Sequence, residues 1–169
     1  MAVTVIADVG GATSNSNCSL ERARAYYATN YYATDANLSD DDKLGQALIT
    51  ATRLMDQGML WNGVVANATQ ALLWPRFGAE KLNGYFFDQH TMPPELLDAT
   101  AEFARQLLQA DRTADSDLQV QGITHLKAGS VELAFQNPTT KVIPDAVYWM
   151  VRHLGRPRTE SGNARVQRC

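Results

Sequence analysis

The sequence predicts a mainly α protein: a small four-helix bundle with one β-hairpin, a structured loop around a Trp-Pro-Arg motif, and extended N- and C-terminal arms. Two patterns predict these elements. Apolar residues recur at helical spacing in four stretches, and they alternate with a period of two near residue 133. The composition agrees with one globular domain, because the 169 residues are 45% hydrophobic and 20% charged.

Residues 1–18 are expected to form an N-terminal arm or an edge strand. A β-prone run, residues 3–6, leads into Gly10, Gly11 and a polar stretch. The glycines do not make a phosphate-binding loop, because the lysine and the strand–helix spacing of such a loop are missing. Ser19 then caps the first helix, with Glu21 in a first turn where the helix dipole favours an acid.

Tyrosines on and after the first helix allow two interpretations. Exposed rings in a row could stack the bases of single-stranded nucleic acid. Alternatively, the rings pack in the core or between subunits, since Leu20 and Ala23 begin the same apolar face at helical spacing. Packing is favoured because no basic residues interleave with the rings downstream. The tyrosines concerned are Tyr26, Tyr27, Tyr31 and Tyr32.

The second helix has an acidic start and an apolar stripe. Ser39 is predicted to be its cap, followed by three aspartates at residues 40–42. These acids interact with the helix dipole and do not form a metal site, because no second cluster of ligands accompanies them. Small and apolar residues recur over residues 44–55, and Gly58 ends the helix.

Residues 70–78, Gln-Ala-Leu-Leu-Trp-Pro-Arg-Phe-Gly, are the least generic stretch of the chain. Trp74 and Phe77 are large apolar anchors on either side of a turn made rigid by Pro75. Arg76 lies between the two rings, where it can stack or bind a carboxylate. Together with Trp61, these residues predict that a structured loop, residues 61–78, is pinned into the helical core.

Asp56 is expected to belong to this loop. It lies in the last turn of the second helix, where the dipole disfavours a carboxylate. It should therefore have a specific partner, either a backbone amide of the loop that starts at Trp61 or the side chain of Arg76. The complete set of predicted loop residues is Asp56, Trp61, Gln70, Trp74, Pro75 and Arg76.

The C-terminal half of the helical domain, which spans residues 19–154, contains two helices and a hairpin. Pro94 suits the first position of the third helix. Strands are expected at residues 120–127 and 131–135, with Ala128 and Gly129 in the turn. A lone hairpin is marginal in water, so it should lie on the helices or on a neighbouring subunit. Pro144 and Asp145 start the last helix.

Charge is unevenly distributed along the chain, although the net charge is only −3. Residues 152–169 contain five arginines and one acid, giving +4, whereas residues 1–151 contain ten bases and seventeen acids, giving −7. An acidic body therefore carries a basic arm, residues 155–169, with little to bury. The arginines of this arm are Arg156, Arg158, Arg165 and Arg168.

No catalytic, metal-binding or cofactor-binding pattern is recognisable. The three histidines are scattered without ligand spacing, and no Gly-x-Ser-x-Gly motif or paired carboxylates are present. The two cysteines, Cys18 and Cys169, are expected to be free thiols in a reducing compartment. No apolar run long enough to span a membrane and no secretory signal are found. We expect a protein that is not an enzyme and binds no cofactor.

The order of these motifs resembles the small head–tail connector, or adaptor, proteins of tailed bacteriophages. The resemblance covers roughly residues 5–155 and is most specific at the Ala-Leu-x-x-Ala-Thr-Arg-x-x-Asp helix followed by Gln-x-Leu-x-Trp-Pro-Arg. Further matching pieces are Asn17-Cys18-Ser19-Leu20, Trp61-x-Gly63, Gly129-Ser130-Val131-Glu132 and Ile143-Pro144. Relatives are often labelled as similar to a primosomal single-stranded-DNA-binding protein.

The resemblance implies a structural protein of the virion neck. Such adaptors form a homo-oligomeric ring, usually dodecameric, below the portal protein, and their C-terminal arm docks on the portal. The ring extends the DNA channel without sequence recognition and contacts a head-closure, stopper or tail-terminator protein. Synthesis in the host cytoplasm would precede assembly at the head–tail junction. Single-stranded DNA binding is the alternative function, and it predicts a basic, aromatic groove.

Overall fold

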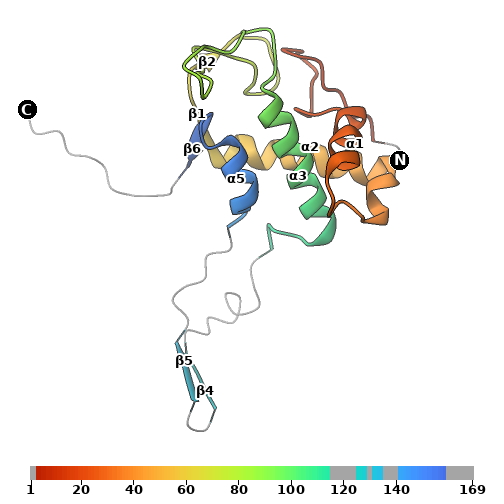
Figure 1. Ribbon diagram of the computed structural model, residues 1–169, viewed down its shortest axis with the longest axis vertical. Coiled ribbons are helices and arrows are strands. Elements are labelled where there is room, and N and C mark those ends of the chain that lie inside the picture. The colour runs from red at the N-terminus through yellow and green to blue at the C-terminus, as the bar shows by residue number, and fades with distance from the viewer. Residues whose placement is uncertain (1–2, 115–124, 129–130, 135–140, 159–169) are drawn as a thin grey trace, which may run out of the picture.

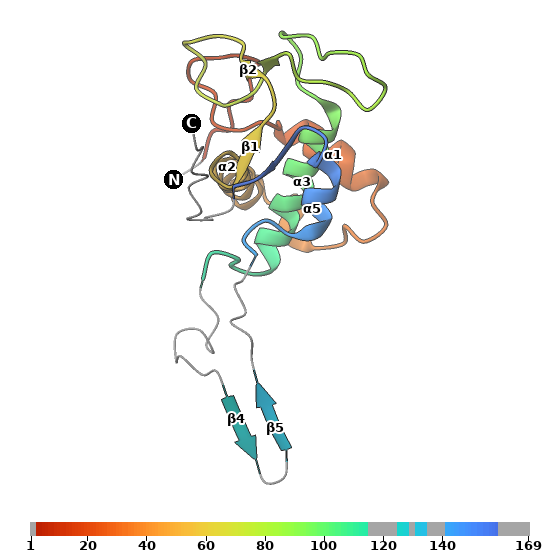
Figure 2. The same cartoon turned by 90° about the vertical axis from the view of Figure 1, so that its left-hand side faces the viewer.

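The computed structural model describes residues 3–114, 125–128, 131–134 and 141–158 of the chain. Four α-helices occur in this part, in agreement with the predicted mainly α class. Helix α3 (Pro94–Gln109) packs against α1 (Leu20–Thr29), α2 (Asp41–Gly58) and α5 (Asp145–Val151). Figures 1 and 2 show that α2 crosses the other helices, so a bundle of near-parallel helices is not confirmed.

The helix starts follow local capping chemistry. The Ser19 hydroxyl accepts a hydrogen bond from the backbone N–H of Arg22, which confirms the predicted cap of α1. The cap of α2 is Asp40 and not Ser39, which closes a short 3₁₀ helix, η1 (Ala36–Ser39). A carboxylate oxygen of Asp40 accepts from two backbone N–H groups at 3.1 Å, and this places the helix start one residue later than predicted.

The core lies where the helices meet. The predicted stripe of α2 is buried, and it faces α3. Helix α5 contributes Val147 and Val151, and Leu154 follows it into the core. The first helix differs from expectation because it ends at Thr29. Tyr31 therefore does not continue the apolar face of α1 and is 87% exposed.

The described residues also form three two-stranded antiparallel sheets. Strand β2 (Val64–Val65) pairs with β3 (Arg76–Phe77). Strand β4 (His125–Ala128) pairs with β5 (Val131–Ala134), which confirms the predicted hairpin. The predicted turn is wrong at Ala128, which pairs with Val131 as the last residue of β4, and the remaining predicted residues lie outside the described part. Strand β1 (Met59–Trp61) pairs with β6 (Gly155–Pro157). Gly155 is required there, because a Cβ atom would lie 2.6 Å from the carbonyl oxygen of Leu60.

The β1–β6 pair corrects the predicted start of the C-terminal arm. Gly155 lies opposite Trp61 in the ladder, and the backbone N–H of Arg158 donates to the carbonyl of Gly58 at 2.7 Å. Residues 155–158 thus belong to the body, because their backbone groups complete a strand that composition alone does not reveal. The rest of the predicted arm, residues 159–169, lies outside the described residues.

The N-terminal segment, residues 3–18, contains no strand in the part described, so the predicted edge strand is not found there. It folds over α2 through polar contacts. The backbone N–H of Val3 donates to the Asp42 carboxylate at 3.1 Å, and that of Asn17 donates to the hydroxyl of Thr52 at 3.0 Å. Asn15 bridges within the segment by accepting from the N–H of Ile6 at 2.8 Å.

Candidate functional site

Arg76 organises the loop of residues 61–78 from within. It is only 9% exposed, and its guanidinium donates to backbone carbonyls on both sides of the loop. Nε bonds Asn62 at 2.7 Å, one Nη bonds Leu73 at 3.1 Å, and the other bonds Gly63 at 2.6 Å and Trp61 at 3.5 Å. The planar fork thus binds backbone carbonyls, whereas the sequence predicts stacking or binding of a carboxylate.

Asp56 anchors the same loop to the end of α2. Its carboxylate accepts from the indole N–H of Trp61 at 3.1 Å and from the backbone N–H of Leu73 at 3.3 Å. Burial raises the pKa of Asp56, and these two hydrogen bonds and the charge of Arg76 oppose that effect. Burial likewise lowers the pKa of Arg76, while Asp56 opposes the change.

Gln70 and the aromatic rings complete the loop. The Gln70 amide donates to the carbonyls of Leu72 at 2.8 Å and Pro75 at 3.1 Å, and the Trp74–Pro75 peptide bond is cis. Trp74 lies between Trp61 and Phe87 in edge-to-face contacts, with ring centroids 5.9 and 6.2 Å apart. Gly63 is required at the close approach of the chain, because φ is +75° and a Cβ would meet the Phe77 carbonyl.

The outer surface of this region is apolar. Val64 and Phe77 are cross-strand partners in β2 and β3, and each is 62% exposed. The turn that follows carries exposed Leu82, Tyr85 and Phe86. Figures 1 and 2 show these segments together at the upper end of the molecule. Exposed apolar side chains that gather on a rigid support are typical of protein contact surfaces.

The tyrosines do not form one platform. Tyr27 is buried and its hydroxyl donates to the Ala101 carbonyl at 2.7 Å. Tyr26 is half-buried and its hydroxyl donates to Glu102 at 3.3 Å. Tyr31 and Tyr32 are exposed and contact each other edge to face, with centroids 5.2 Å apart. Only the second pair is available for stacking with a ligand.

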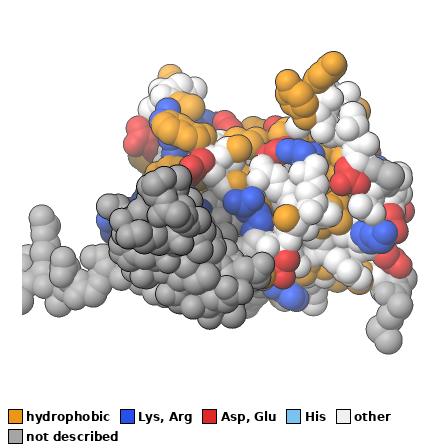
Figure 3. All heavy atoms as spheres, turned by 90° about the horizontal axis from the view of Figure 1, so that it is seen from below, with side chains coloured by type: hydrophobic (Ala, Val, Ile, Leu, Met, Phe, Trp, Pro, Cys, Tyr) orange, Lys and Arg blue, Asp and Glu red, His pale blue; other side chains and the backbone are white. Residues whose placement is uncertain are grey.

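Basic side chains of the described residues are largely engaged. Figure 3 shows basic and acidic side chains interspersed over the coloured part of one face, without a continuous basic area. Arg152 stacks over Trp149 at 4.3 Å. Five further cations form ion pairs, namely Arg22 with Asp98, Arg24 with Asp41, Lys43 with Asp40, Arg105 with Glu102, and Lys141 with Asp145.

The four arginines predicted for the C-terminal arm fall into two groups. Arg156 is an exposed residue of β6, and Arg158 is exposed directly after it. Both therefore lie on the body, next to β1. Arg165 and Arg168 lie outside the described residues.

Reactive and metal-binding groups are also located. Burial raises the pKa of the Cys18 thiol to about 12, so this cysteine is not an activated nucleophile. No group of three or more His, Cys, Asp or Glu side chains in the described part could hold a metal ion. None of the described helices is both long and apolar enough to cross a membrane.

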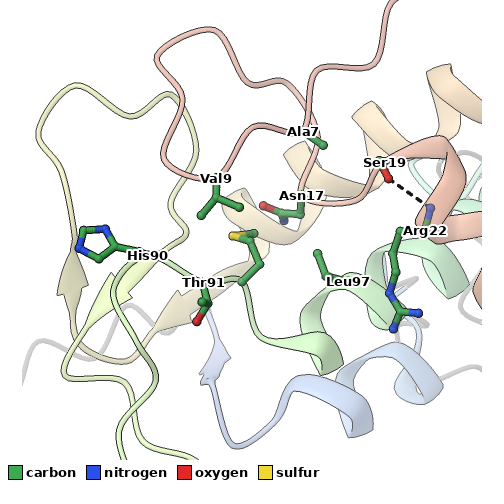
Figure 4. Close-up of a pocket in the computed structure, with 9 residues that line it drawn as sticks. Ala7, Val9, Asn17, Ser19, Arg22, His90, Thr91 and Leu97 are labelled. Carbon is green, nitrogen blue, oxygen red and sulfur yellow. Dashed lines mark hydrogen bonds between the residues drawn. The ribbon is translucent and has the colours of Figure 1, made fainter.

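Sequence reasoning missed Asn17. It lines a pocket of about 330 Å³ between the N-terminal segment and the start of α3 (Figure 4). The residue is 3% exposed, yet neither polar atom of its side chain has a hydrogen-bond partner. No pattern in a single sequence marks such a residue, because the missing partners become visible only after folding.

The fold and these surfaces define a small helix-rich protein with an internally hydrogen-bonded loop and an exposed apolar surface on and next to that loop. The whole chain, residues 1–169, matches the model of a family described as "Putative DnaT-like ssDNA binding protein". The chain belongs to this family. Neither the curated proteins nor the solved structures contain a match to the chain. The family description agrees with the alternative function, single-stranded DNA binding, and does not address a head–tail adaptor role.

Proposed function

We propose that this protein is a structural head–tail adaptor without catalytic activity. Copies associate into a ring, dodecameric as in the adaptors that the sequence resembles, below a portal protein. A head-closure, stopper or tail-terminator protein binds the far side, and viral DNA passes through the lumen without sequence recognition. The protein is made in the host cytoplasm and functions in the neck of the virion. The observation that supports this proposal most is the exposed apolar surface on the Arg76 loop and on the turn that follows it. Its residues are Val64, Phe77, Leu82, Tyr85 and Phe86.

That surface is suited to contacts between proteins because its backbone is held in place. In the turn at residues 80–86, the N–H of Lys81 donates to the carbonyl of Tyr85 at 2.7 Å, and the N–H of Gly84 donates to that of Lys81 at 3.0 Å. Leu82 and Phe86 thus project from a fixed turn. Apolar side chains presented in one conformation lose little entropy on association, which favours subunit contacts. Nonpolar contacts that repeat head to tail can close into a ring.

The position of β6 supports portal binding by the end of the chain. Because Arg158 is bonded to Gly58, residues 159–169 start from a fixed point on the body. This segment is basic, with Arg165 and Arg168 against Glu160. A short basic segment that orders on an acidic or polar partner surface would connect the ring to its neighbour.

Single-stranded DNA binding is the second candidate, and the family description favours it. The exposed pair Tyr31 and Tyr32 could stack bases, and the basic end of the chain could contact phosphates. The ion pairs of Arg22 and Arg24 with acids weigh against a continuous groove near these rings. The comparisons thus support this function through the family description. The described surface also exposes rings away from the tyrosine pair, at Phe77, Tyr85 and Phe86, but it offers little positive charge that is not already paired or stacked.

The first experiment measures binding to a purified portal ring by co-sedimentation. Full-length protein is compared with a chain truncated after Arg158, which keeps β6 and its pairing with β1. We expect full-length protein to bind and the truncated chain to lose binding while its circular dichroism is unchanged. Failure of the full-length protein to bind any portal ring from the same genome would refute the adaptor proposal.

The second experiment measures the fluorescence anisotropy of a labelled thymidine oligonucleotide at 150 mM salt. The matched variant is the double substitution Tyr31→Ser, Tyr32→Ser, which removes the exposed rings only. We expect no saturable binding below about 100 μM, the range of weak non-specific association. Tight binding by the wild type that the double substitution abolishes would establish the DNA-binding function in its place.

A further inference from the structure

The pocket at Asn17 is mainly apolar and lies between three parts of the chain. The N-terminal segment and the start of α1 contribute one side, the loop before α3 a second, and α3 the third. The lining residues in that order are Ala7, Val9, Asn17, Ser19 and Arg22, then His90, Thr91 and Met92, then Leu97. Figure 4 shows the Asn17 side chain directed into the space between Val9 and Leu97. The volume of the pocket, about 330 Å³, is sufficient for one large side chain with its adjoining peptide groups.

Asn17 is held rigidly by its backbone. The N–H donates to the Thr52 hydroxyl at 3.0 Å, and that hydroxyl donates to the carbonyl of Leu48 at 3.0 Å within α2. On either side, the Ser16 hydroxyl and the backbone of Cys18 are bonded to each other. The residue therefore cannot easily turn its side chain to solvent, and its carboxamide stays buried.

The carboxamide of Asn17 has a donor and an acceptor, and both lack a partner. Buried polar atoms without hydrogen bonds are rare in folded proteins and unfavourable. An amide side chain is complementary to extended backbone, because the N–H and C=O of one extended residue point to the same side, where a carboxamide can accept from the first and donate to the second. The missing partner is therefore best supplied by backbone of another polypeptide.

We propose that this pocket binds an extended polypeptide segment of a partner protein, with one aliphatic side chain against Val9, Met92 and Leu97 and the backbone N–H and C=O of one residue hydrogen-bonded to the Asn17 carboxamide. Aliphatic walls select an aliphatic side chain, and the carboxamide selects the backbone next to it. Both requirements are met by any extended segment with a leucine-like residue. The inference does not depend on ring formation or on portal binding.

Access to the carboxamide requires one side chain to move. Both polar atoms of Asn17 are shielded from solvent, and Met92 lines the same pocket and is half-buried. Methionine is unbranched and flexible, so it can change rotamer at little cost when a ligand enters. We expect Met92 to change rotamer when a ligand reaches Asn17.

A nucleobase is the competing ligand class, because asparagine can pair with an adenine edge through the same two groups. The pocket walls oppose it. Stable binding of an unpaired base relies on stacking against aromatic rings and on cations for phosphate. The pocket lining does include one ring, His90, and one cation, Arg22. Figure 4 shows the His90 ring on the far side of Val9 from Asn17, and Arg22 is paired with Asp98, so neither group is placed to hold a base at the carboxamide.

The test uses N-acetyl-leucine methylamide, the smallest molecule with a leucine side chain between two peptide groups. Isotope-labelled full-length protein is titrated and followed by NMR. We expect saturable shifts of the Asn17 side-chain NH₂ and the Met92 methyl signals, with a dissociation constant on the order of 1 mM. The control 4-methylpentan-1-ol has the same branched side chain without peptide groups and should bind at least about tenfold more weakly, because its single hydroxyl oxygen must serve both carboxamide groups in place of a separate N–H and C=O.

Two variants separate recognition from folding. Asn17→Leu keeps the branched shape of the side chain without its polar atoms and should abolish the preference for the diamide over the alcohol. Asn17→Asp keeps the acceptors but lacks the donor, and should weaken diamide binding about tenfold. Equal binding of diamide and alcohol by the wild-type protein, or shifts caused by deoxyadenosine and not by the diamide, would overturn the proposal.

Discussion

Two irregular segments pack on α2, and they differ in whether a buried polar side chain has hydrogen-bond partners. In residues 61–78, buried Arg76 bonds four backbone carbonyls, and Asp56 accepts two hydrogen bonds from the same loop. In residues 3–18, buried Asn17 bonds Thr52 through its backbone, but its side chain has no partner.

The difference separates a structural role from a binding role. A buried polar group with all its partners fixes the chain in one conformation, whereas one without partners lowers stability until a ligand supplies them. Trp74 is an apparent exception, because its indole N–H is buried and unpaired in the first segment. The indole N–H of Trp74 is a single donor on a ring that packs between Trp61 and Phe87. Trp74 does not line the pocket at Asn17, so a ligand in that pocket would not reach it.

Removing Arg76 should have the largest effect. Arg76→Ala leaves several loop carbonyls without donors, and we expect the free energy of unfolding to fall by about 3 kcal/mol. Arg76→Lys should recover less than half of this loss, because an ammonium group cannot reach both sides of the loop as a planar fork does. Urea unfolding measures both values. The matched control is Arg53→Ala on an exposed position of α2, which should change stability by less than about 0.5 kcal/mol.

If Arg76→Ala lowers the free energy of unfolding by less than about 1 kcal/mol, the hydrogen bonds of Arg76 do not stabilise the loop, and the two segments do not differ as described. That result would mean that water replaces the guanidinium at these carbonyls without cost. The loop would then be held by Trp61 and Trp74, and the hydrogen bonds of Arg76 would describe its geometry without contributing to stability.

Predictability from the sequence differed between regular and irregular parts. Ser19, Pro94 and Pro144 were found as helix starts, because capping and proline preferences act within one turn. The β4–β5 hairpin was found because alternation and a two-residue turn are local signals. Strand β6 was missed, because a three-residue strand with Gly and Pro gains its structure only from pairing with distant β1.

The candidate sites show the same limit. A dipole argument predicted that Asp56 has a specific partner, and the structure identifies Trp61 and Leu73. The partners of Arg76 were not predicted, because backbone carbonyls have no sequence signature. Asn17 was quoted only as part of a matching motif and was not predicted to bind a ligand, since its missing hydrogen bonds depend on where separate segments meet.

Glu102 is a buried polar residue with hydrogen-bond partners that lies outside the two segments. Its buried carboxylate accepts from Arg105 at 2.6 and 3.0 Å and from Tyr26 and Asn30 of the first helix region at 3.3 Å. We expect Glu102→Gln to lower the free energy of unfolding by about 2 kcal/mol at pH 7. Thermal or urea unfolding measures it, and an exposed substitution such as Glu21→Gln is the control.

The pH dependence of Glu102 gives a second check. Burial alone would raise the pKa of Glu102, but hydrogen bonds from Arg105 and Gln106 outweigh burial and lower the pKa below 4.5. The stabilisation is therefore complete above about pH 4.5 and is lost as the pH falls through the folded-state pKa. The gap between wild type and Glu102→Gln should narrow over that range, and a gap that is constant from pH 7 to pH 3 would contradict this assignment.

Asn17→Leu should have the opposite sign. Replacing the unpaired carboxamide with an apolar side chain of similar size removes two unsatisfied groups, so we expect a gain of about 1 kcal/mol in the free energy of unfolding. Ser16→Ala is a suitable contrast, because its hydroxyl has partners and its removal should destabilise. A loss of stability in Asn17→Leu would mean that the carboxamide is satisfied in solution by water, and the two segments would no longer differ.

Asp56 should show the smallest effect and the clearest pH signature. Burial raises the pKa of Asp56 above its usual value of 3.8. At a pH between the unfolded-state and folded-state pKa values, the folded state therefore keeps a proton that the unfolded state has lost. Stability from this group is therefore greatest at low pH and falls as the pH rises from about 3.8 through the folded-state pKa. Asp56→Asn does not titrate and keeps one acceptor, so at pH 7 we expect it to lie within about 1 kcal/mol of wild type and to become relatively less stable on acidification. The difference between the two proteins, measured by urea unfolding from pH 7 to pH 3.5, should thus run against that of Glu102→Gln. If both differences ran in the same direction, the carboxylate of Asp56 would be stabilised in its charged form by Trp61 and Leu73 more than burial opposes it, and the loop would hold its acid as firmly as the helices hold Glu102.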